Sequence, residues 1–409
     1  MKKVWFVVLF FFSLVLLAGC QEVEPSEPVV SHPETEVPTV IVEEGTFVVE
    51  VRNLAGDILL SESVVYDEDS EMSIAELIDE QIGMDYTVHP EYGWFVQGVG
   101  NIYPTEFNVT YNYWFSLLVN GEMSFVGIEN IEYEEGLTVT FKESSMLDQE
   151  DLKVDRLIYE FLDKHLATYM NEHVTHYGVF AALKQLKTRG YHTIELTANL
   201  EVADQTIGDL YKKTILQMVL EVDTDATKAL LESKATTNVY EAISLLYGLT
   251  MVGGNAQMIE DLVNLIITTE NTYMDADYAG MTLAVLSYYQ DIEGVEAFIN
   301  QMLDYILTTL SDTGVTSWGQ ANASSTAQVI LGLVALGINP RGEVYTTEGM
   351  DLIEALLLYS LEGAFRYQLT QSEADMSFST PQAFQALVAY KIYRDTWGNP
   401  PVELHNLGA

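Results

Sequence analysis

The alternation of apolar and polar side chains changes its period near residue 145. Before that point, short runs rich in β-branched and aromatic residues follow a period of two and are bounded by Asn, Gly and Asp, which is typical of β-strands. After it, longer apolar segments follow a helical period. The pattern predicts a multidomain α+β protein in which a small, mainly β domain precedes an all-α domain.

The first domain, residues 45–145, contains five strand-like runs. Asn120-Gly121 separates two apolar runs and predicts a tight hairpin, because both residues tolerate positive φ. One helix interrupts the strands, since Ser73 and Glu76 have the spacing of a capping box before an apolar stripe. The predicted strands are TFVVEVRN, ILLSESVVY, WFVQGV, YWFSLLVN and GLTVTFKE.

The second domain, residues 146–400, repeats one helical pattern. Five segments begin with a polar cap and are then apolar on nearly every face, so each must be buried on all sides. More amphipathic helices lie between them, at a repeat of about 40 to 60 residues. About a dozen helices would fit, enough to close a double ring. The five segments are 175–186, 237–249, 276–289, 323–337 and 378–390.

The N-terminal residues indicate export. Met1-Lys2-Lys3 precedes an apolar run, and Leu17-Ala18-Gly19-Cys20 fits a lipobox, in which cleavage before Cys20 leaves a lipid on its thiol. The run of about 14 apolar residues is shorter than the roughly 20 that span a bilayer. We expect a signal peptide over 1–19, an acidic, Pro-rich tether over 20–44 and a lipid-anchored protein on the extracellular face of the cell membrane.

The charge excludes one class of partner. The chain has 61 acidic and 18 basic residues, a net charge of −43. Nucleic-acid binding needs clustered Lys and Arg that displace counterions, so we expect none. Cys20 is the only cysteine, which leaves the mature protein without a disulfide or a thiolate zinc site. We expect a monomer whose C-terminal residues, 401–409, form a tail.

The first domain resembles the small β domain of the intrinsic factor and transcobalamin family. Tyr92-Gly93 occupies the family's Trp-Gly place, and Gly100-Asn101-Ile102 matches the end of the same run. Tyr113-Trp114, Gly127-Ile128 and the strand 137–141 follow in the family's order. The resemblance extends to a bacterial domain of the same shape that occurs on surface lipoproteins.

The second domain resembles the α/α toroid that the cobalamin carriers share with terpenoid cyclases and protein prenyltransferases. Ser379-Thr380-Pro381-Gln382 and the residues up to Leu387 are close to the start of an inner helix in the carriers. The two resemblances cover nearly all of the chain after the tether. The order departs from the family, because here the β domain comes first, and the family's disulfides are missing.

The resemblance implies a cobalamin- or corrinoid-binding protein that holds its ligand between the two domains and delivers it to a membrane importer, such as one of the energy-coupling-factor type. Cobalamin would then be a bound ligand, with no catalytic cofactor and no catalytic residue. A corrin has apolar faces and an amide rim, which neutral hydrogen-bonding groups suit better than charges. The implied contacts in the helical domain are Tyr177, Asn238, Tyr240, Asp277, Gln320, Asn322, Ser325, Gln328, Thr380, Gln382 and Gln385, and those in the β domain are Tyr92, Gly93 and Trp94.

One of these positions, and two histidines outside the list, have alternative interpretations. Asp277 could instead be a plain helix N-cap. His173 and His176 stand three residues apart, but no third ligand has matching spacing, so we expect no protein metal site. His176 is the one candidate ligand for the cobalt of a corrin.

Other classes remain open beside the carrier. A carbohydrate- or cell-wall-binding lipoprotein is the first alternative, since aromatic side chains at the opening of a toroid also suit sugars. A degenerate toroid enzyme, such as a polysaccharide lyase or a terpenoid cyclase, is the second. The toroid has no cysteine for a prenyltransferase zinc site. Asp275-Ala276-Asp277-Tyr278 lacks the last Asp of a cyclase acid cluster, and with it the like-charge repulsion that raises a carboxyl pKa. We therefore expect no enzyme activity.

Overall fold

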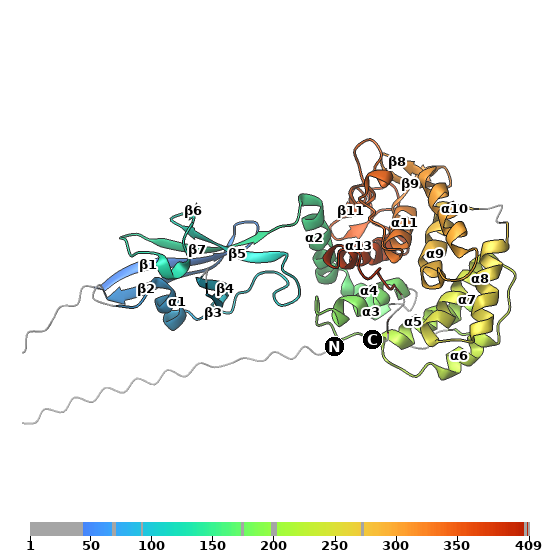
Figure 1. Cartoon of the computed structure of the whole chain (residues 1–409), viewed down its shortest axis with the longest axis horizontal. Helices are drawn as coiled ribbons and strands as arrows, with labels where there is room; N and C mark the ends of the chain where they lie inside the picture. The colour runs from blue at the N-terminus through green and yellow to red at the C-terminus, as the bar shows by residue number, and fades with distance from the viewer. Residues whose placement is uncertain are drawn as a thin grey trace, which may run out of the picture.

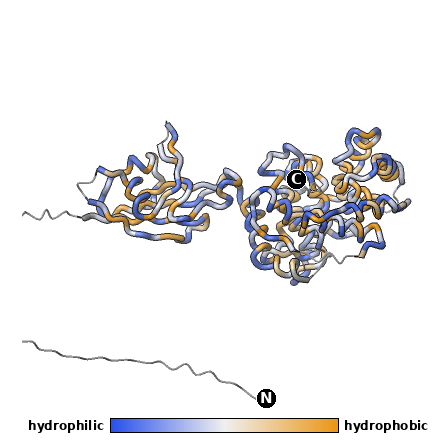
Figure 2. Tube along the Cα trace, turned by 90° about the horizontal axis from the view of Figure 1, so that it is seen from below, coloured by the Kyte–Doolittle hydropathy of each residue, from blue (hydrophilic) through white to orange (hydrophobic). Residues whose placement is uncertain are grey.

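The computed structural model describes residues 44–67, 71–90, 93–172, 176–197, 203–270, 274–404 and 407. These residues form a β domain and a larger helical domain that lie side by side, which confirms the predicted α+β class (Figure 1). The view at right angles shows the same two lobes (Figure 2). The predicted signal peptide and Cys20 lie outside the described residues. None of the described helices is long and apolar enough to cross a membrane.

The β domain is built on a five-stranded sheet in the order β2-β1-β7-β5-β6. β1 pairs in parallel with β7, and the other neighbours are antiparallel. A separate antiparallel pair, β3-β4, lies beside it. All five predicted strands are present. The strands are β1 (Glu44–Arg52), β2 (Ile58–Asp67), β3 (Met84–His89), β4 (Gly93–Val99), β5 (Tyr113–Val119), β6 (Glu122–Met123) and β7 (Thr138–Ser145).

Local signals position the remaining parts of this domain. Helix α1 (Ile74–Gln81) begins at the predicted capping box, in which Ser73 and Glu76 satisfy each other's backbone N–H groups. Asn120 and Gly121 have φ values of 51° and 84°, as a primed hairpin turn requires. The core between α1 and the sheet contains Phe47, Val49, Val51, Val64, Ile74, Ile78, Val139 and Phe141.

Six inner helices of the second domain form a closed ring. Neighbours pack in the order α4, α5, α7, α9, α11 and α13, and α13 packs back against α4. Helices α8, α10, α12 and α2 each pack against one inner helix and α6 packs against two, α5 and α7, so the expected double ring is present in the described residues. The helices are α2 (Gln149–Lys164), α3 (Leu166–Glu172), α4 (Tyr177–Thr188), α5 (Ile207–Val219), α6 (Asp225–Glu232), α7 (Val239–Val252), α8 (Ala256–Thr268), α9 (Ala276–Leu286), α10 (Val295–Leu307), α11 (Ala323–Ala335), α12 (Leu352–Leu357) and α13 (Ser379–Asp395).

Two glycines let α9 and α11 cross closely. A Cβ on Gly280 would lie 2.4 Å from the carbonyl oxygen of Gln328, and one on Gly332 would lie 2.7 Å from the carbonyl oxygen of Gly280. Real Cβ atoms do not come so near to backbone, so a larger residue at either position would push the helices apart. The helices are therefore held backbone to backbone at this point of the ring.

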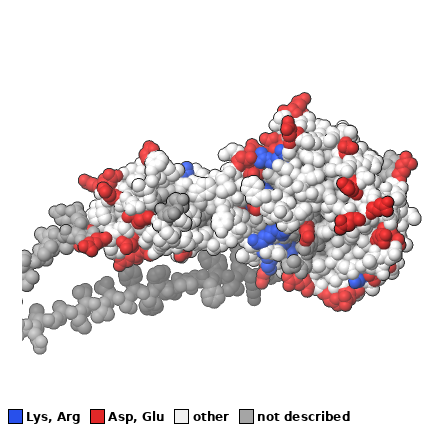
Figure 3. Space-filling model, in the orientation of Figure 1, with Lys and Arg blue, Asp and Glu red and all other residues white. Residues whose placement is uncertain are grey.

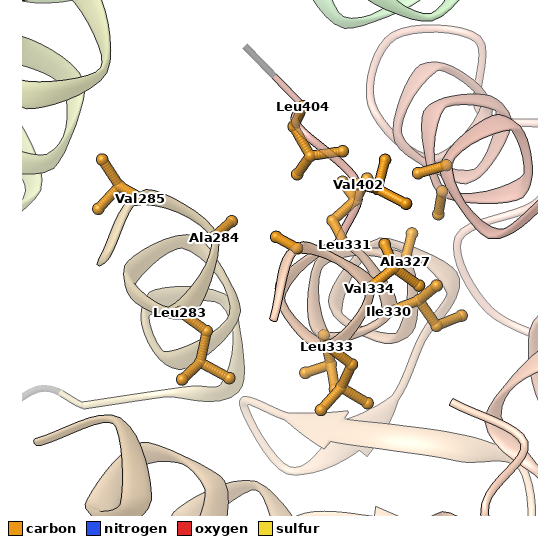
Figure 4. Packing of buried hydrophobic residues seen from close by; sticks show 14 of the residues in the cluster. Leu283, Ala284, Val285, Ala327, Ile330, Leu331, Leu333, Val334, Val402 and Leu404 are labelled. Carbon is orange, nitrogen blue, oxygen red and sulfur yellow. The ribbon is translucent and has the colours of Figure 1, made fainter. Parts of the chain in front are cut away.

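The C-terminal residues belong to the helical core, although we expected a separate tail from residue 401. Val402, Leu404 and Leu407 are at most 3% exposed. The amide of Gln185 donates to the carbonyl oxygens of Glu403 and Leu404, and the N–H of Val402 donates to the carbonyl of Val334. Figure 4 shows Val402 and Leu404 beside α11. These residues fill one end of the ring.

A buried lysine joins the two domains. Nζ of Lys391, on α13, lies 2.7 Å from Oε1 of Glu106, which belongs to the loop between β4 and β5. It also lies 3.1 Å from Asp155 of α2 and 3.3 Å from Asp395. The side chains of Lys391 and Glu106 are each 1% exposed. An uncompensated charge at this depth would cost several kcal/mol, so Lys391 and its carboxylates hold one another in place.

Tyrosine and arginine side chains complete this junction. The hydroxyl of Tyr113, on β5, donates to Asp155 at 2.6 Å, and that of Tyr159, on α2, donates to Glu106 at 2.7 Å. Arg394 binds Asp155 and Asp395 through its guanidinium. The pKa of Glu106 is raised, because the effect of burial exceeds that of Lys391, which acts to lower it. The pKa of Asp395 is lowered, because Lys391 and Arg394 together outweigh the effect of burial. We call these residues, with Lys391, the junction network.

The segment that joins the two domains, Lys142 to Glu150, is not a free hinge. Lys142 to Ser145 pair with β5 as part of β7, and α2 begins at Gln149 with Asp148 as its N-cap. Only three residues separate the last strand from the first helix of the next domain. The domains are thus connected by a short link as well as by the junction network.

Replacing Lys391 by Met should lower the free energy of unfolding by about 3–5 kcal/mol, because Glu106 would remain buried without a cation, and Asp155 and Asp395 would keep only Arg394. Urea unfolding at neutral pH measures this change. Lys164→Met is the control, since Lys164 is 42% exposed and 3.9 Å from Glu362, and its loss should cost less than about 1 kcal/mol. Equal effects of the two substitutions would contradict the role given to Lys391.

Candidate functional site

A cavity of about 630 Å³ opens at the N-terminal ends of the inner helices. All six inner helices contribute to it, and Leu404 of the C-terminal segment also lines it. No carboxylate is among its described lining residues, and Lys212 is the one lysine. We call this cavity the mouth. Its side chains come from His176, Tyr177, Tyr211, Lys212, Ser244, Tyr247, Met281, Gln328, Leu331, Ser377, Phe378, Pro381, Gln382, Gln385 and Leu404.

A second hollow of about 420 Å³ adjoins the mouth, because Phe378 and Gln382 line both. Its other lining residues are Asp277, Ser324, Tyr367, Gln371 and Asp375. Asp375 is already occupied, since its carboxylate accepts from the N–H groups of Ser377, Phe378 and Ser379 at the start of α13. Asp277 is therefore the acid that this hollow offers to a ligand.

Three tyrosines form one wall of the mouth. The ring of Tyr211 stands edge-on to Tyr177 with centroids 5.2 Å apart, and stacks on Tyr247 at 5.7 Å. The hydroxyl of Tyr247 donates to the carbonyl of Met281 at 2.9 Å. Burial raises the pKa of all three hydroxyls, so they remain neutral at physiological pH. The wall presents aromatic surface to a ligand with no charge.

Two glutamines of α13 supply amide groups to the mouth. Oε1 of Gln382 is buried and accepts no hydrogen bond from a described residue. A buried acceptor without a donor costs about 1–3 kcal/mol, which a ligand N–H or O–H would recover. Gln385 lies against the backbone of α4, where a Cβ on Gly178 would come within 2.7 Å of its Oε1. Gly178 thus makes room for this amide.

Asp277 is not the N-cap of α9. Asp275 holds that place and accepts from the N–H of Tyr278 at 2.8 Å. The carboxylate of Asp277 instead accepts from the hydroxyl of Ser325, on α11, at 3.2 Å. Burial raises the pKa of Asp277 to about 6, although the bond from Ser325 lowers it, and the charge of Asp275 raises it further. The acid is thus partly protonated near neutral pH.

The structure brings only some of the predicted ligand contacts to these cavities. Tyr177, Gln328, Gln382 and Gln385 line the mouth, together with His176, and Asp277 lines the adjoining hollow.

Three predicted contacts are buried in the core instead. Asn322 and Thr380 are 0% exposed and Ser325 is 1% exposed. Asn322 caps α11 by accepting from the N–H of Ser325, and the hydroxyl of Thr380 bonds both the N–H and the carbonyl of Phe365. The motif that suggested ligand contact is used here to fix helix starts to neighbouring loops. Ser325 acts on the site only through Asp277.

Three more predicted contacts lie outside both cavities. Asn238 is the exposed N-cap of α7 and accepts from the N–H groups of Tyr240 and Glu241. The ring of Tyr240 packs edge-on against Tyr278. The amide of Gln368 donates to Oε1 of Gln320 at 2.5 Å. These side chains stabilise the helix and hairpin ends around the mouth.

The β domain does not cover the mouth in this structure. Its contacts reach the C-terminal half of α13, at Lys391 and Asp395, whereas the mouth is at the N-terminal start of that helix. Trp94 stacks on Tyr86 at 3.8 Å, and Gly93 packs against Glu129; neither lines the mouth. Tyr92 lies outside the described residues. The β domain and the mouth therefore do not enclose a common space in this structure.

Helix α5 is the part of the site that the sequence interpretation missed. It supplies Tyr211 and Lys212, yet it lies outside the five segments in which the sequence predicts inner helices. A capping box was present as a signal, because Thr206 and Asp209 satisfy each other at the start of this helix. Phe378 was also missed as a contact, although it is 69% exposed beside both cavities.

The described residues contain no group of three or more His, Cys, Asp or Glu side chains placed to hold a metal ion. His176 caps α4 from the edge of the mouth, with its ring edge-on to Tyr169 at 4.4 Å. An imidazole in this place could bind a metal carried by a ligand. His173 lies outside the described residues.

No model of a protein family matches the chain. No curated protein matches its sequence.

Replacing Asp277 by Asn should stabilise the protein above about pH 6. A carboxyl whose pKa is raised on folding loses stability as pH rises from its unfolded value, near 3.8, to its folded value of about 6. The variant should gain on the order of 2 kcal/mol near pH 7, and the gain should vanish below about pH 4. Urea unfolding across this range measures it. A gain that does not depend on pH would contradict the raised pKa.

Proposed function

We propose that this chain is a lipid-anchored extracellular protein that captures cobalamin or a related corrinoid in the mouth of its helical domain and passes it to a membrane importer. The observation that carries the proposal is the mouth itself, a ring of six helix starts lined by tyrosine and glutamine, with no carboxylate among its described residues. Such a lining suits a broad apolar ligand with an amide rim.

Specific groups have complementary roles in this proposal. The wall of Tyr177, Tyr211 and Tyr247 offers aromatic surface to a corrin face. Oε1 of Gln382 would accept from a side-chain amide of the corrin, since it has no donor within the described protein. Asp277, protonated in part near neutral pH, can donate to an amide carbonyl. His176, which lines the mouth, would offer its imidazole to the metal.

The acidic exterior agrees with a ligand that carries no net negative charge. Asp and Glu side chains are spread over the visible face of the helical domain, and Lys and Arg are few (Figure 3). The chain's net charge of −43 would repel an anionic ligand at long range. Because the β domain stands at the other end of α13, the ligand in this proposal is held by the helical domain alone.

Cyanocobalamin mixed with the chain from Gln21 onward should elute with the protein in gel filtration as a coloured complex. Gln382→Leu should weaken binding about 5- to 100-fold, because the buried acceptor that a corrin amide would satisfy is gone. Gln320→Leu is the matched control, an exposed glutamine outside both cavities, and should change nothing. The absence of retained colour with cobalamin or cobinamide would overturn the proposal.

One observation favours an enzyme as second candidate. An acid with a pKa of about 6 in a hollow can donate a proton near neutral pH, as the cyclases that share the toroid require of their carboxylic acid. Incubation with squalene, followed by gas chromatography, tests it. Cyclised product from the native chain and none from Asp277→Asn would support this candidate over capture.

A further inference from the structure

A second cavity, about 550 Å³ in volume, lies on the β domain away from the mouth. It is formed by β4, by the loop between β4 and β5, by the start of β5 and by Met146. We call it the β groove. Its lining consists of Phe95, Val96, Gln97, Pro104, Phe107, Asn108, Val109, Thr110, Tyr111, Tyr113, Trp114 and Met146.

The lining of the β groove is uncharged. None of the described residues that line it is Asp, Glu, Lys, Arg or His, in a chain of which 19% of residues are charged. A charged ligand would find no counter-ion there, and desolvating it would be costly. The groove therefore selects a neutral ligand.

Aromatic rings stand open in the groove. Tyr111 is 93% exposed and Phe95 is 53% exposed, which leaves their faces free for a ligand. Phe107 is fixed in place because its ring stacks on Tyr103 with centroids 4.7 Å apart. Such faces pack well against the C–H faces of sugar rings or against other flat apolar groups.

Polar groups beside the rings separate these two ligand classes. The side-chain amides of Gln97 and Asn108 and the indole N–H of Trp114 are engaged in no hydrogen bond within the described protein. A purely apolar ligand would strip water from these groups and give nothing back. A ligand with hydroxyl groups around its rings satisfies them while its C–H faces cover the aromatic side chains.

The loop that forms one side of the groove is held by the junction network. Glu106 lies in this loop, and its carboxylate binds Lys391 at 2.7 Å and accepts from Tyr159 at 2.7 Å. The N–H of Thr105 donates to Glu143 at 2.6 Å. A loop fixed at these points presents Phe107, Asn108 and Tyr111 in one arrangement, which lowers the entropic cost of binding.

We propose that the β groove binds a neutral saccharide chain. Tyr111 and Phe95 stack on sugar rings, and Gln97, Asn108 and Trp114 hydrogen-bond the hydroxyl or acetamido groups. This site is separate from the mouth and does not rest on the function proposed for it. A surface protein with this groove would hold a polysaccharide of its surroundings while its helical domain stays free.

Chitohexaose is the probe, titrated by calorimetry into the chain from Gln21 onward. Binding is expected, and Tyr111→Ala should weaken it about 3- to 10-fold through lost stacking. Gln97→Leu should weaken it about 2- to 10-fold. Phe125→Ala is the matched control, because Phe125 is 98% exposed on the same domain outside the groove, and should leave the affinity unchanged.

Two further titrations test where chitohexaose binds and whether the groove selects a neutral chain. Gln382→Leu should bind chitohexaose as the native chain does, since Gln382 lies in the mouth. Polygalacturonate, an anionic chain, should bind at least tenfold more weakly, by about 1.4 kcal/mol. Absence of binding, binding unaffected by both Tyr111→Ala and Gln97→Leu, or binding lost in Gln382→Leu would each overturn the proposal.

Discussion

The ammonium group of Lys391 is the point on which the arrangement of this molecule depends. It is buried between two domains and contacts a carboxylate from the β domain and two from the helical domain. A buried charge is tolerated only when its partners are all in place, so this group penalises every other way of docking the domains. Tyr113 and Tyr159 bind the same carboxylates across the junction and restrict the arrangement further.

This docking separates two possible ligand sites. Because Lys391 lies near the C-terminal end of α13, the β domain meets the helical domain at the end opposite to the mouth. The mouth is left open, with its aromatic wall and glutamines unshielded by another domain. The loop that carries Glu106 simultaneously forms one side of the β groove. One ion network thus fixes the geometry around one cavity and keeps the other uncovered.

Features with local causes were predictable from the sequence. The capping box at Ser73, the turn at Asn120-Gly121 and the all-round apolar inner helices each result from residues close together in the chain. Tyr177, Gln328 and Gln382 could be assigned to the mouth because they stand early in such helices. The pairing of Glu106 with Lys391 has no local signal, since 285 positions separate them and each reads as a surface charge. For the same reason the burial of Thr380 could not be foreseen: its partner, Phe365, comes from a different segment.

The distance between the β groove and the mouth tests this account most directly. Spin labels at Phe95→Cys and Phe378→Cys, in a chain whose own cysteine is replaced by Ser, report that distance by pulsed electron resonance. The account predicts a single population of label-to-label distances, longer than about 20 Å, which is the rise of α13 between Phe378 and Lys391. This distance should not change when cyanocobalamin is added. A shorter population, or one that appears with the corrinoid, would mean that the β domain closes over the mouth and would contradict the fixed junction.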